Sequence, residues 1–170
     1  MILAFLVISA FLIFLLYLLF KYCRVFCQQT IYDEIGIIGS QAKICIFCEI
    51  AVDLNNVLYF NNDLFVKFDI NPESNFHLLV ISRRHIQNIS RLKECDFYLI
   101  KEMVEIGEKM IKENKLIENC IFAFHKPIFT SVPHLHLHII GLPFYSNLGK
   151  LKFSKCSTVD PYELLQKWNP

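Results

Sequence analysis

Three histidines alternate with apolar residues towards the C-terminal end of the chain, and this alternation constrains the fold more than any other feature. The segment reads H-L-H-L-H-I-I, from His134 to Ile140. Strict alternation is typical of a β-strand with one buried face. The apolar side chains are therefore expected to enter the core, while His134, His136 and His138 leave the opposite face, about 6.6 Å apart in successive pairs. Imidazoles titrate near neutrality, so such a row can handle a proton and an anion together.

The rest of the chain predicts further strands and one long helix. Apolar runs of strand length occur at residues 64–68, 76–81 and 121–124. A long amphipathic pattern extends from about residue 92 to residue 113, and Gly107 on its apolar side is expected to allow the close approach of a strand or another helix. Strands, a helix and then strands within one short domain point to an α+β fold with an antiparallel sheet.

The first 20 residues contain no charged side chain. An apolar helix of that length spans about 30 Å, the hydrocarbon thickness of a bilayer. No basic residue precedes the run and no small-x-small cleavage site follows it, so we expect an uncleaved transmembrane helix; a cleaved signal or a misplaced start codon are the alternatives. Lys21 and Arg24 follow directly, which predicts a single-pass membrane protein with its domain on the cytoplasmic side.

Four parts are expected along the chain. They are a transmembrane anchor over residues 1–20, a connector over 21–43, an α+β domain over 44–151 and a C-terminal tail over 152–170 with a helical turn near 161–168. The odd count of seven cysteines argues against a complete disulfide framework and agrees with a reducing compartment. The net charge of +1 gives no electrostatic argument for nucleic acid as a partner.

The histidine row suits chemistry at phosphorus. A neutral imidazole can attack phosphorus and so split one displacement into two steps, while neighbouring donors stabilise the phosphoryl oxygens. His136 is the geometric choice for the nucleophile because both of its neighbours in the row reach the same phosphate, and Ser131 could deliver a proton to the leaving atom. Three structural histidines, or a transition-metal site, are the alternatives that the pattern alone leaves open.

The row resembles the signature of the histidine triad family, His-φ-His-φ-His-φ-φ with φ apolar. Three more motifs occur in the family's order: C-I-F-C-E-I at residues 45–50, F-D-I-N-P at 68–72 and H-L-L-V-I-S-R-R-H-I at 77–86. The segment F-H-K-P-I-F-T-S-V at 124–132 looks most like the third Hint-type branch of the family, with a fainter similarity to aprataxin. The resemblance extends from residue 44 to about residue 151, and four ordered motifs together are very specific.

The resemblance implies a histidine-triad fold, with an antiparallel sheet and one long helix, commonly as a homodimer. It implies purine nucleotide substrates of the AMP type and hydrolysis at the α-phosphate through a nucleotidyl-histidine, as in adenosine phosphoramidases, with no cofactor required for catalysis. By the motif match His136 is the nucleophile, His138 and Ser131 contact the phosphate or the leaving group, and His77 supports the nucleophile.

The nucleotide-binding residues are also implied by the motif match. Asp69 matches the acid that binds the ribose hydroxyls, with an Asx turn before Asn71 as the alternative. Phe68 and Ile70 would flank the base. His125 stands where the commonest Hint proteins have an asparagine, and the loop after it lacks glycine, so the leaving-group pocket is where this chain departs from the family.

Cys45 and Cys48 form a C-x-x-C pair, which by itself fits zinc binding, redox chemistry or coincidence. Relatives that keep this pair resemble the galactose-1-phosphate uridylyltransferases, in which two histidines complete a tetrahedral zinc site; that resemblance adds His85 and His134 as ligands. Zinc would then be structural, leaving the other two histidines of the row free. The alternative is two buried free thiols, with His134 bonded to a backbone carbonyl.

The leading functional prediction is a membrane-anchored nucleotide hydrolase of the phosphoramidase type. Hydrolysis of dinucleoside polyphosphates stays open as a second enzymatic function. Removal of adenylate from nucleic-acid ends, as in aprataxin, is disfavoured because the sequence has no basic stripe and no C-terminal zinc finger. A non-catalytic nucleotide-binding or scaffold protein is the alternative from a different class.

Overall fold

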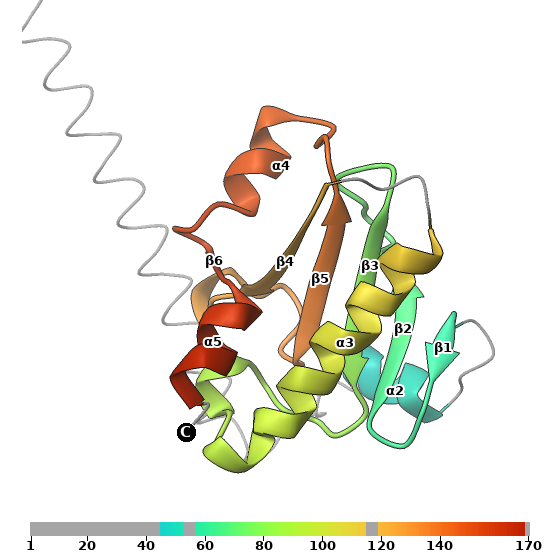
Figure 1. The fold of residues 1–170 in the computed structure, drawn as a ribbon, viewed down its shortest axis with the longest axis vertical. Coiled ribbons are helices and arrows are strands. Elements are labelled where there is room, and N and C mark those ends of the chain that lie inside the picture. The colour runs from blue at the N-terminus through green and yellow to red at the C-terminus, as the bar shows by residue number, and fades with distance from the viewer. Residues whose placement is uncertain (1–44, 53–56, 115–118, 169–170) are drawn as a thin grey trace, which may run out of the picture. The chain divides into compact units, whose positions relative to one another are not determined.

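The computed structural model describes residues 45–52, 57–114 and 119–168, which belong to one compact unit, Ile44–Pro170. Its centre is a six-stranded antiparallel sheet in the order β1-β2-β3-β5-β4-β6 (Figure 1). The strands are β1 (Tyr59–Phe60), β2 (Leu64–Phe68), β3 (His77–Ser82), β4 (Cys120–His125), β5 (His136–Gly141) and β6 (Thr158–Val159). The helices are α2 (Ile46–Val52), α3 (Phe97–Glu113), α4 (Asn147–Lys152) and α5 (Pro161–Trp168), with 3-10 turns η1 (Ile89–Arg91), η2 (Glu94–Asp96) and η3 (Pro127–Phe129). The predicted α+β fold with an antiparallel sheet is confirmed.

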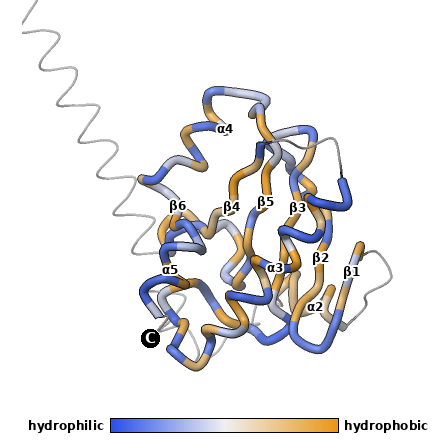
Figure 2. The backbone as a smooth tube through the Cα atoms, viewed as in Figure 1, coloured by the Kyte–Doolittle hydropathy of each residue, from blue (hydrophilic) through white to orange (hydrophobic). Residues whose placement is uncertain are grey.

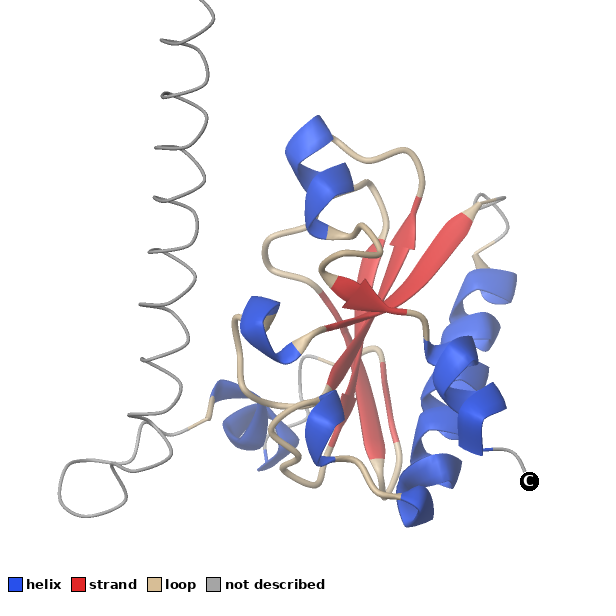
Figure 3. Ribbon diagram, turned by 90° about the vertical axis from the view of Figure 1, so that its left-hand side faces the viewer, coloured by secondary structure: helices blue, strands red, loops and turns tan. Residues whose placement is uncertain are grey.

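Different elements cover the two faces of the sheet, which Figure 3 shows nearly edge-on. Helix α3 packs on one face, where the main core contains Leu78, Leu137 and Ile139. On the other face α2 packs against apolar side chains of β2 and β3. Apolar residues are concentrated in the central strands (Figure 2). The register pairs Leu79 with His138 and Ile81 with His136, so the triad leucines point towards α3 and the histidines point away from it, as predicted.

The long helix begins later than the periodicity predicts. The apolar pattern extends back to residue 92, but α3 starts at Phe97, and two 3-10 turns precede it. The carboxylate of Asp96 accepts a hydrogen bond from the backbone N–H of Lys93 at 2.8 Å and pairs with Arg84. This side chain closes a separate turn, so the α-helix starts after it.

Gly107 lies where α3 meets the sheet, as predicted. A Cβ atom at this position would lie 2.5 Å from Ile139 Cδ1 and 2.6 Å from Phe122 Cε1. Both contacts are shorter than carbon atoms tolerate, because the helix backbone approaches β4 and β5 without a side chain in between. The glycine therefore sets the distance between α3 and the strands that carry the histidines.

The predicted C-terminal tail is part of the compact unit. The helical turn expected near residues 161–168 is found as α5, and its apolar side chains, Leu164, Leu165 and Trp168, pack against the main core. Strand β6, which no pattern in the sequence predicts, pairs with the end of β4 and places Thr158 opposite His125. The tail therefore helps to hold β4 in place beside β5.

Among the residues that the structure describes, no helix has the length and hydropathy needed to cross a bilayer. The predicted anchor over residues 1–20 and the connector over 21–43 lie outside the described residues.

Candidate active site

The three histidines of the row lie on the sheet face opposite α3, but they are buried. His134, His136 and His138 are only 0%, 6% and 5% exposed, and β5 begins at His136, so His134 precedes the strand. The ring of Phe47 in α2 packs edge-on against His134 and His136, with centroids 5.7 and 5.3 Å apart. Phe153 packs against His138 with the centroids 5.0 Å apart. These aromatic rings cover the row, which alternation alone does not predict.

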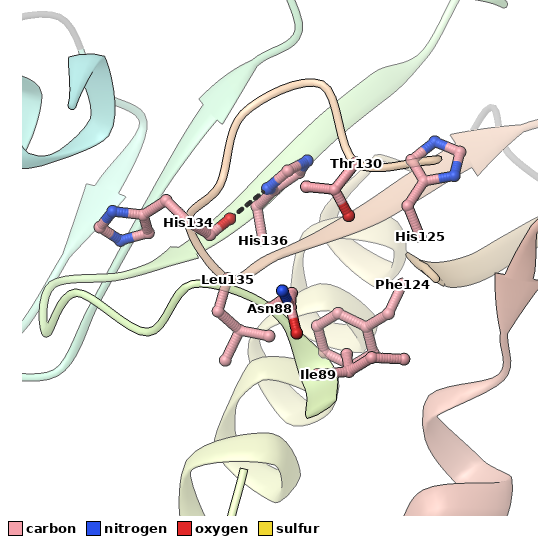
Figure 4. Close-up of a pocket in the computed structure, with 8 residues that line it drawn as sticks. All are labelled: Asn88, Ile89, Phe124, His125, Thr130, His134, Leu135 and His136. Atoms are coloured by element: carbon pink, nitrogen blue, oxygen red, sulfur yellow. Dashed lines mark hydrogen bonds between the residues drawn. The ribbon is translucent and has the colours of Figure 1, made fainter. Parts of the chain in front are cut away.

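His136 has the tautomer of a nucleophile. Its Nδ1 lies 2.6 Å from the backbone carbonyl oxygen of His134. A carbonyl oxygen only accepts, so Nδ1 carries the proton and Nε2 keeps its lone pair. Figure 4 shows this second nitrogen on the side of the ring away from His134, towards Thr130. Burial lowers the pKa of His136, which keeps the ring neutral and able to attack.

His77 and His138 form a hydrogen-bonded relay that begins at the backbone. The N–H of Glu73 donates to His77 Nδ1 at 3.2 Å, so the proton of His77 is on Nε2. That Nε2 lies 2.9 Å from His138 Nδ1, which therefore accepts and leaves the proton of His138 on its own Nε2. His138 Nε2 is buried and has no hydrogen-bond partner among the described residues. Burial is the main cause that holds the pKa of His138 well below its ordinary value, and repulsion between the protonated forms of His138 and His136 adds to it. The relay thus presents a neutral N–H donor beside the nucleophile.

Asp69 lies at the end of β2 and makes two kinds of contact. Its Oδ1 accepts from the backbone N–H of Asn71 at 2.9 Å, which is the Asx turn considered above. Its Oδ2 lies 3.3 Å from His77 Nε2 and 3.8 Å from His138 Nδ1. These three groups converge closely enough to hold a metal, but Nε2 of His77 carries a proton in the relay and has no lone pair to offer. The cluster is therefore a hydrogen-bonded one.

The other predicted residues lie around this centre. Phe68 and Ile70 flank Asp69 and are 54% and 75% exposed, so they present an apolar surface to solvent at the end of β2. Ser131 is exposed in the loop before β5 and makes no hydrogen bond to another described residue. The structure thus places Asp69 beside the histidines but does not bring Ser131 into contact with them.

His125 ends β4, on the other side of β5 from β3. Its ring lies 4.9 Å from that of His138 and 4.8 Å from that of Phe153 (centroid distances). Burial lowers the pKa of His125 to about 4, so the ring is neutral at pH 7. The nearby backbone of Ser157 acts to raise this pKa, but it does not lie in hydrogen-bond geometry with the ring. Both ring nitrogens of His125 are therefore without hydrogen-bond partners among the described residues. A small pocket between the β4–β5 loop and η1 is lined in part by His125, Thr130 and His136 (Figure 4).

The four predicted metal ligands come together in a cage next to the row. The distances are 3.4 Å from Cys45 Sγ to His134 Nδ1, 3.2 Å from Cys48 Sγ to His85 Nδ1, and 3.3 Å between the two Nδ1 atoms. Tetrahedral zinc, with bonds of about 2.0–2.3 Å, separates its ligand atoms by about 3.3–3.8 Å. His134 Nε2 lies 2.6 Å from the carbonyl oxygen of Ser82, so it donates there and turns the lone pair of Nδ1 into the cage. The donor set and its tautomer therefore fit zinc.

Two site residues are not predicted from the sequence. Phe153 lies 15 positions after His138 and touches three site histidines, but it belongs to none of the motifs. The backbone N–H of Glu73 fixes the tautomer of His77, and no residue type signals a backbone donor. Only the return of the C-terminal segment across the sheet, which long-range packing determines, brings Phe153 to the site.

Comparisons with known proteins show a family match and several similar proteins. Residues 44–153 match the family model described as scavenger mRNA decapping enzyme C-terminal binding. Adenosine 5'-monophosphoramidase HINT3 of Danio rerio is 36% identical over 140 residues, which cover 78% of this chain and 83% of the relative. The bifunctional adenosine 5'-phosphosulfate phosphorylase/adenylylsulfatase HINT4 of Arabidopsis thaliana is 30% identical over 136 residues, covering 75% and 93%.

Solved structures share the fold. A HIT family hydrolase from Legionella pneumophila superposes with a TM-score of 0.53 and 26% identity, covering 61% of this chain and 96% of that one. A histidine triad protein from Clostridium difficile gives a TM-score of 0.54 at 23% identity, covering 63% and 100%.

Proposed function

The chain belongs to the histidine triad family, and on that premise we propose that it is a hydrolase that cleaves purine nucleotides at the α-phosphate. The adenosine phosphoramidase type of reaction, through a nucleotidyl-histidine, is supported by the Danio rerio relative, which is named an adenosine 5'-monophosphoramidase; the Arabidopsis thaliana relative is named an adenylylsulfatase. One observation of the site carries the proposal. Nδ1 of His136 is tied to the His134 carbonyl at 2.6 Å, which leaves Nε2 free for attack.

The first half of the reaction forms a bond between His136 Nε2 and phosphorus and breaks the bond from phosphorus to the leaving nitrogen. His138 Nε2–H donates to a phosphoryl oxygen as charge develops there. The covalent imidazole becomes cationic, and the carbonyl of His134 stabilises it by accepting from Nδ1. The amine takes up one proton as it leaves, for which the Ser131 hydroxyl is the proposed route. In the second half water attacks phosphorus, releases AMP and returns one proton.

The nucleoside end of the substrate is assigned to the end of β2. Phe68 and Ile70 are exposed apolar residues that can cover both faces of a purine. The Oδ2 atom of Asp69 is available to the ribose hydroxyls once it turns from His77, while Oδ1 stays in its turn with Asn71. These assignments follow from the family motif, and the exposure of Phe68 and Ile70 supports them.

Structural zinc in the cage of Cys45, Cys48, His85 and His134 is part of the same proposal. The metal would fix the start of the catalytic strand, because the His134 side chain would be a ligand while the His134 backbone carbonyl accepts the hydrogen bond from Nδ1 of His136. It would take no part in the reaction at phosphorus, since the reactive nitrogens of His136 and His138 lie outside the cage.

Two features of the whole protein are proposed from the sequence. The uncharged run over residues 1–20 supports a single-pass membrane anchor, with the domain on the cytoplasmic side. The family resemblance supports a homodimer. Neither a nucleic acid nor a catalytic cofactor is required by the chemistry above.

The test of the reaction is release of AMP from an adenosine phosphoramidate by the full chain in detergent. We expect His136→Ala to lower the rate by at least about a thousandfold, because the covalent route needs this nitrogen. His138→Ala should slow both halves and allow the adenylated protein to accumulate, which intact mass spectrometry detects. Tight binding of AMP by the wild type without turnover of any adenylate would instead support the non-catalytic alternative.

A further inference from the structure

Phe153 closes one side of the histidine cluster. Its side chain is buried, and its ring centroid lies 4.8 Å from that of His125, 5.0 Å from His138 and 5.6 Å from His77. Phe144 stacks on its other side at 6.1 Å. The ring packs against His125 and His138, which have buried ring nitrogens without a hydrogen-bond partner among the described residues. Unpartnered buried donors are costly, so a polar group is expected to reach them during the reaction.

Phe153 is held in this position through Glu73, in the loop between β2 and β3. The ammonium group of Lys152 lies 3.1 Å from Glu73 Oε1. The backbone N–H of Tyr145 donates to the carbonyl of Glu73 at 2.8 Å. Helix α4 also packs closely on this residue, since a Cβ at Gly149 would lie 2.8 Å from Glu73 Oε2. The C-terminal segment is thus clamped to the loop that follows Asp69.

The order of the strands shows which part of a substrate meets Phe153. The sheet runs β2-β3-β5-β4, with the proposed nucleoside-binding residues at the end of β2 and the nucleophile on β5. The phosphate is held at His136 and His138 and the nucleoside is directed towards β2, so we assign the remaining substituent to the side of β4. His125 lies on that side, and the ring of Phe153 reaches from His125 across His138 to His77. The remaining substituent is the leaving group.

We propose that Phe153, held by the pair of Glu73 and Lys152, is a specificity-determining residue that restricts the reaction to compact leaving groups. The inference rests on the proposed function and names a substrate class for it. A compact amine fits beside His125 without displacing the ring. A bulky amine has to push Phe153 aside, which breaks its contacts with the histidines and separates Lys152 from Glu73. Steric selection of this kind typically changes kcat/KM by about 10-fold to 200-fold.

The experiment compares two AMP amidates that have the same P–N bond and similar amine basicity, one with a propyl group and one with a 3-phenylpropyl group. The measured quantity is kcat/KM for the bulky amidate divided by kcat/KM for the compact one. For Phe153→Ala we expect this ratio to rise about tenfold or more. Glu73→Gln keeps the backbone contacts but removes the charge, and it should raise the ratio by a smaller factor, because the pair is partly exposed. The control Phe60→Ala removes an exposed ring from β1 and should leave the ratio unchanged.

The outcomes separate this inference from the proposed function. No AMP release by the wild type from either amidate would overturn the proposed function, and this inference with it. Turnover of both amidates with the same ratio in the wild type and in folded Phe153→Ala would overturn the size selection alone. Loss of both activities in a folded variant would also overturn it, because Phe153 would then be required for the chemistry. Should Phe153→Ala melt well below the wild type, Phe153→Leu provides the same comparison with less loss of packing.

Discussion

Each histidine of the row has a different role because each has a different partner for one of its ring nitrogens. His134 donates a hydrogen bond from Nε2 to the backbone carbonyl of Ser82, and its Nδ1 faces Cys45 and Cys48. His136 donates a hydrogen bond from Nδ1 to the backbone carbonyl of His134, two residues before it. His138 receives a hydrogen bond from His77 and keeps its own proton for a ligand. Hydrogen bonds to neighbours thus fit three identical side chains for three different roles, which we propose to be those of a metal ligand, a nucleophile and a donor.

His125 predicts how stability changes with pH. Its pKa is about 4 in the folded protein, well below its ordinary value of 6.5, because burial disfavours the charged ring. Below pH 6.5 the unfolded chain therefore takes up a proton that the folded protein does not, and stability falls until about pH 4, below which this loss is complete. At pH 5 the loss from this one residue is about 2 kcal/mol.

Urea unfolding of the wild type and His125→Asn at pH 7 and pH 5 measures this contribution. Acidification should cost the wild type about 2 kcal/mol more than the variant. The remaining buried histidines shift both proteins in the same direction, so the difference between the two isolates residue 125. An equal loss in both proteins would contradict a depressed pKa at this position.

Cys48 provides the test of zinc binding. We expect the purified full chain to contain about one zinc per chain. Cys48→Ser should lose the metal and several kcal/mol of unfolding free energy, because the ligands of a structural site converge only in the folded state. Atomic emission and a thermal melt measure the two effects. Cys95→Ser is the matched control, since Cys95 is exposed and lies outside the cage. Metal-free wild type with an unaltered melt in Cys48→Ser would end the zinc proposal.

At the scale of elements, Gly107 is the point where α3 is most sensitive to substitution. Alanine favours helix formation over glycine by about 1 kcal/mol, but its Cβ would collide with Ile139 and Phe122 at about 2.5 Å. Overpacking of this kind costs about 1–3 kcal/mol, so after the gain in helix propensity Gly107→Ala should destabilise the protein by up to about 2 kcal/mol. Chemical denaturation measures this change, with the exposed Lys112→Ala as a control in the same helix. Equal or greater stability in Gly107→Ala would show that α3 can move away from the sheet.

Local sequence patterns predict the elements of this fold well where a single periodicity decides the structure. Alternation at residues 134–140 predicts a strand with its histidines on one face, and the glycine on the apolar side of the helix marks the close contact with the sheet. The start of α3 is predicted wrongly, because a side chain bonded to its own turn outweighs the apolar period at residues 92–96. Strand β6 has two residues and forms through its pairing with β4, which no local pattern records.

The candidate site is predictable to the same extent. The four cage residues and the central histidines follow from the family motifs, and the structure brings them together. The burial of the row is not predictable, because it depends on Phe47 and Phe153, which come from opposite ends of the domain sequence. Ser131 matches a family motif but makes no hydrogen bond to the histidines here.

At the scale of the whole molecule, the two faces of the sheet carry different kinds of side chain. The face under α3 and α5 holds the main apolar core, and the opposite face holds the histidines between α2 and the C-terminal segment. Stability and chemistry therefore draw on different side chains of the same strands. Substitutions on the α3 face are expected to act through stability, whereas those on the opposite face are expected to change the site and, at the cage and the smaller apolar clusters, stability as well.

The proposed anchor leads to a prediction for the full chain. The chain should sediment with membranes and resist extraction at high salt, because 20 uncharged residues at its N-terminus can span the bilayer. A chain that begins at residue 44 should remain in the supernatant and keep its activity on adenosine phosphoramidates. Fractionation with an activity assay tests both statements. Salt-extractable full chain would count against a transmembrane anchor.

The contact between residues 134 and 136 has a practical consequence for genetics. His136 is held by the main chain of residue 134, and every amino acid supplies the same carbonyl there. A side-chain replacement at 134 thus removes a ligand of the proposed cage but retains the acceptor for His136. Comparing it with a replacement of His136 itself would show how much of the reaction depends on the metal-binding cage and how much on the nucleophile.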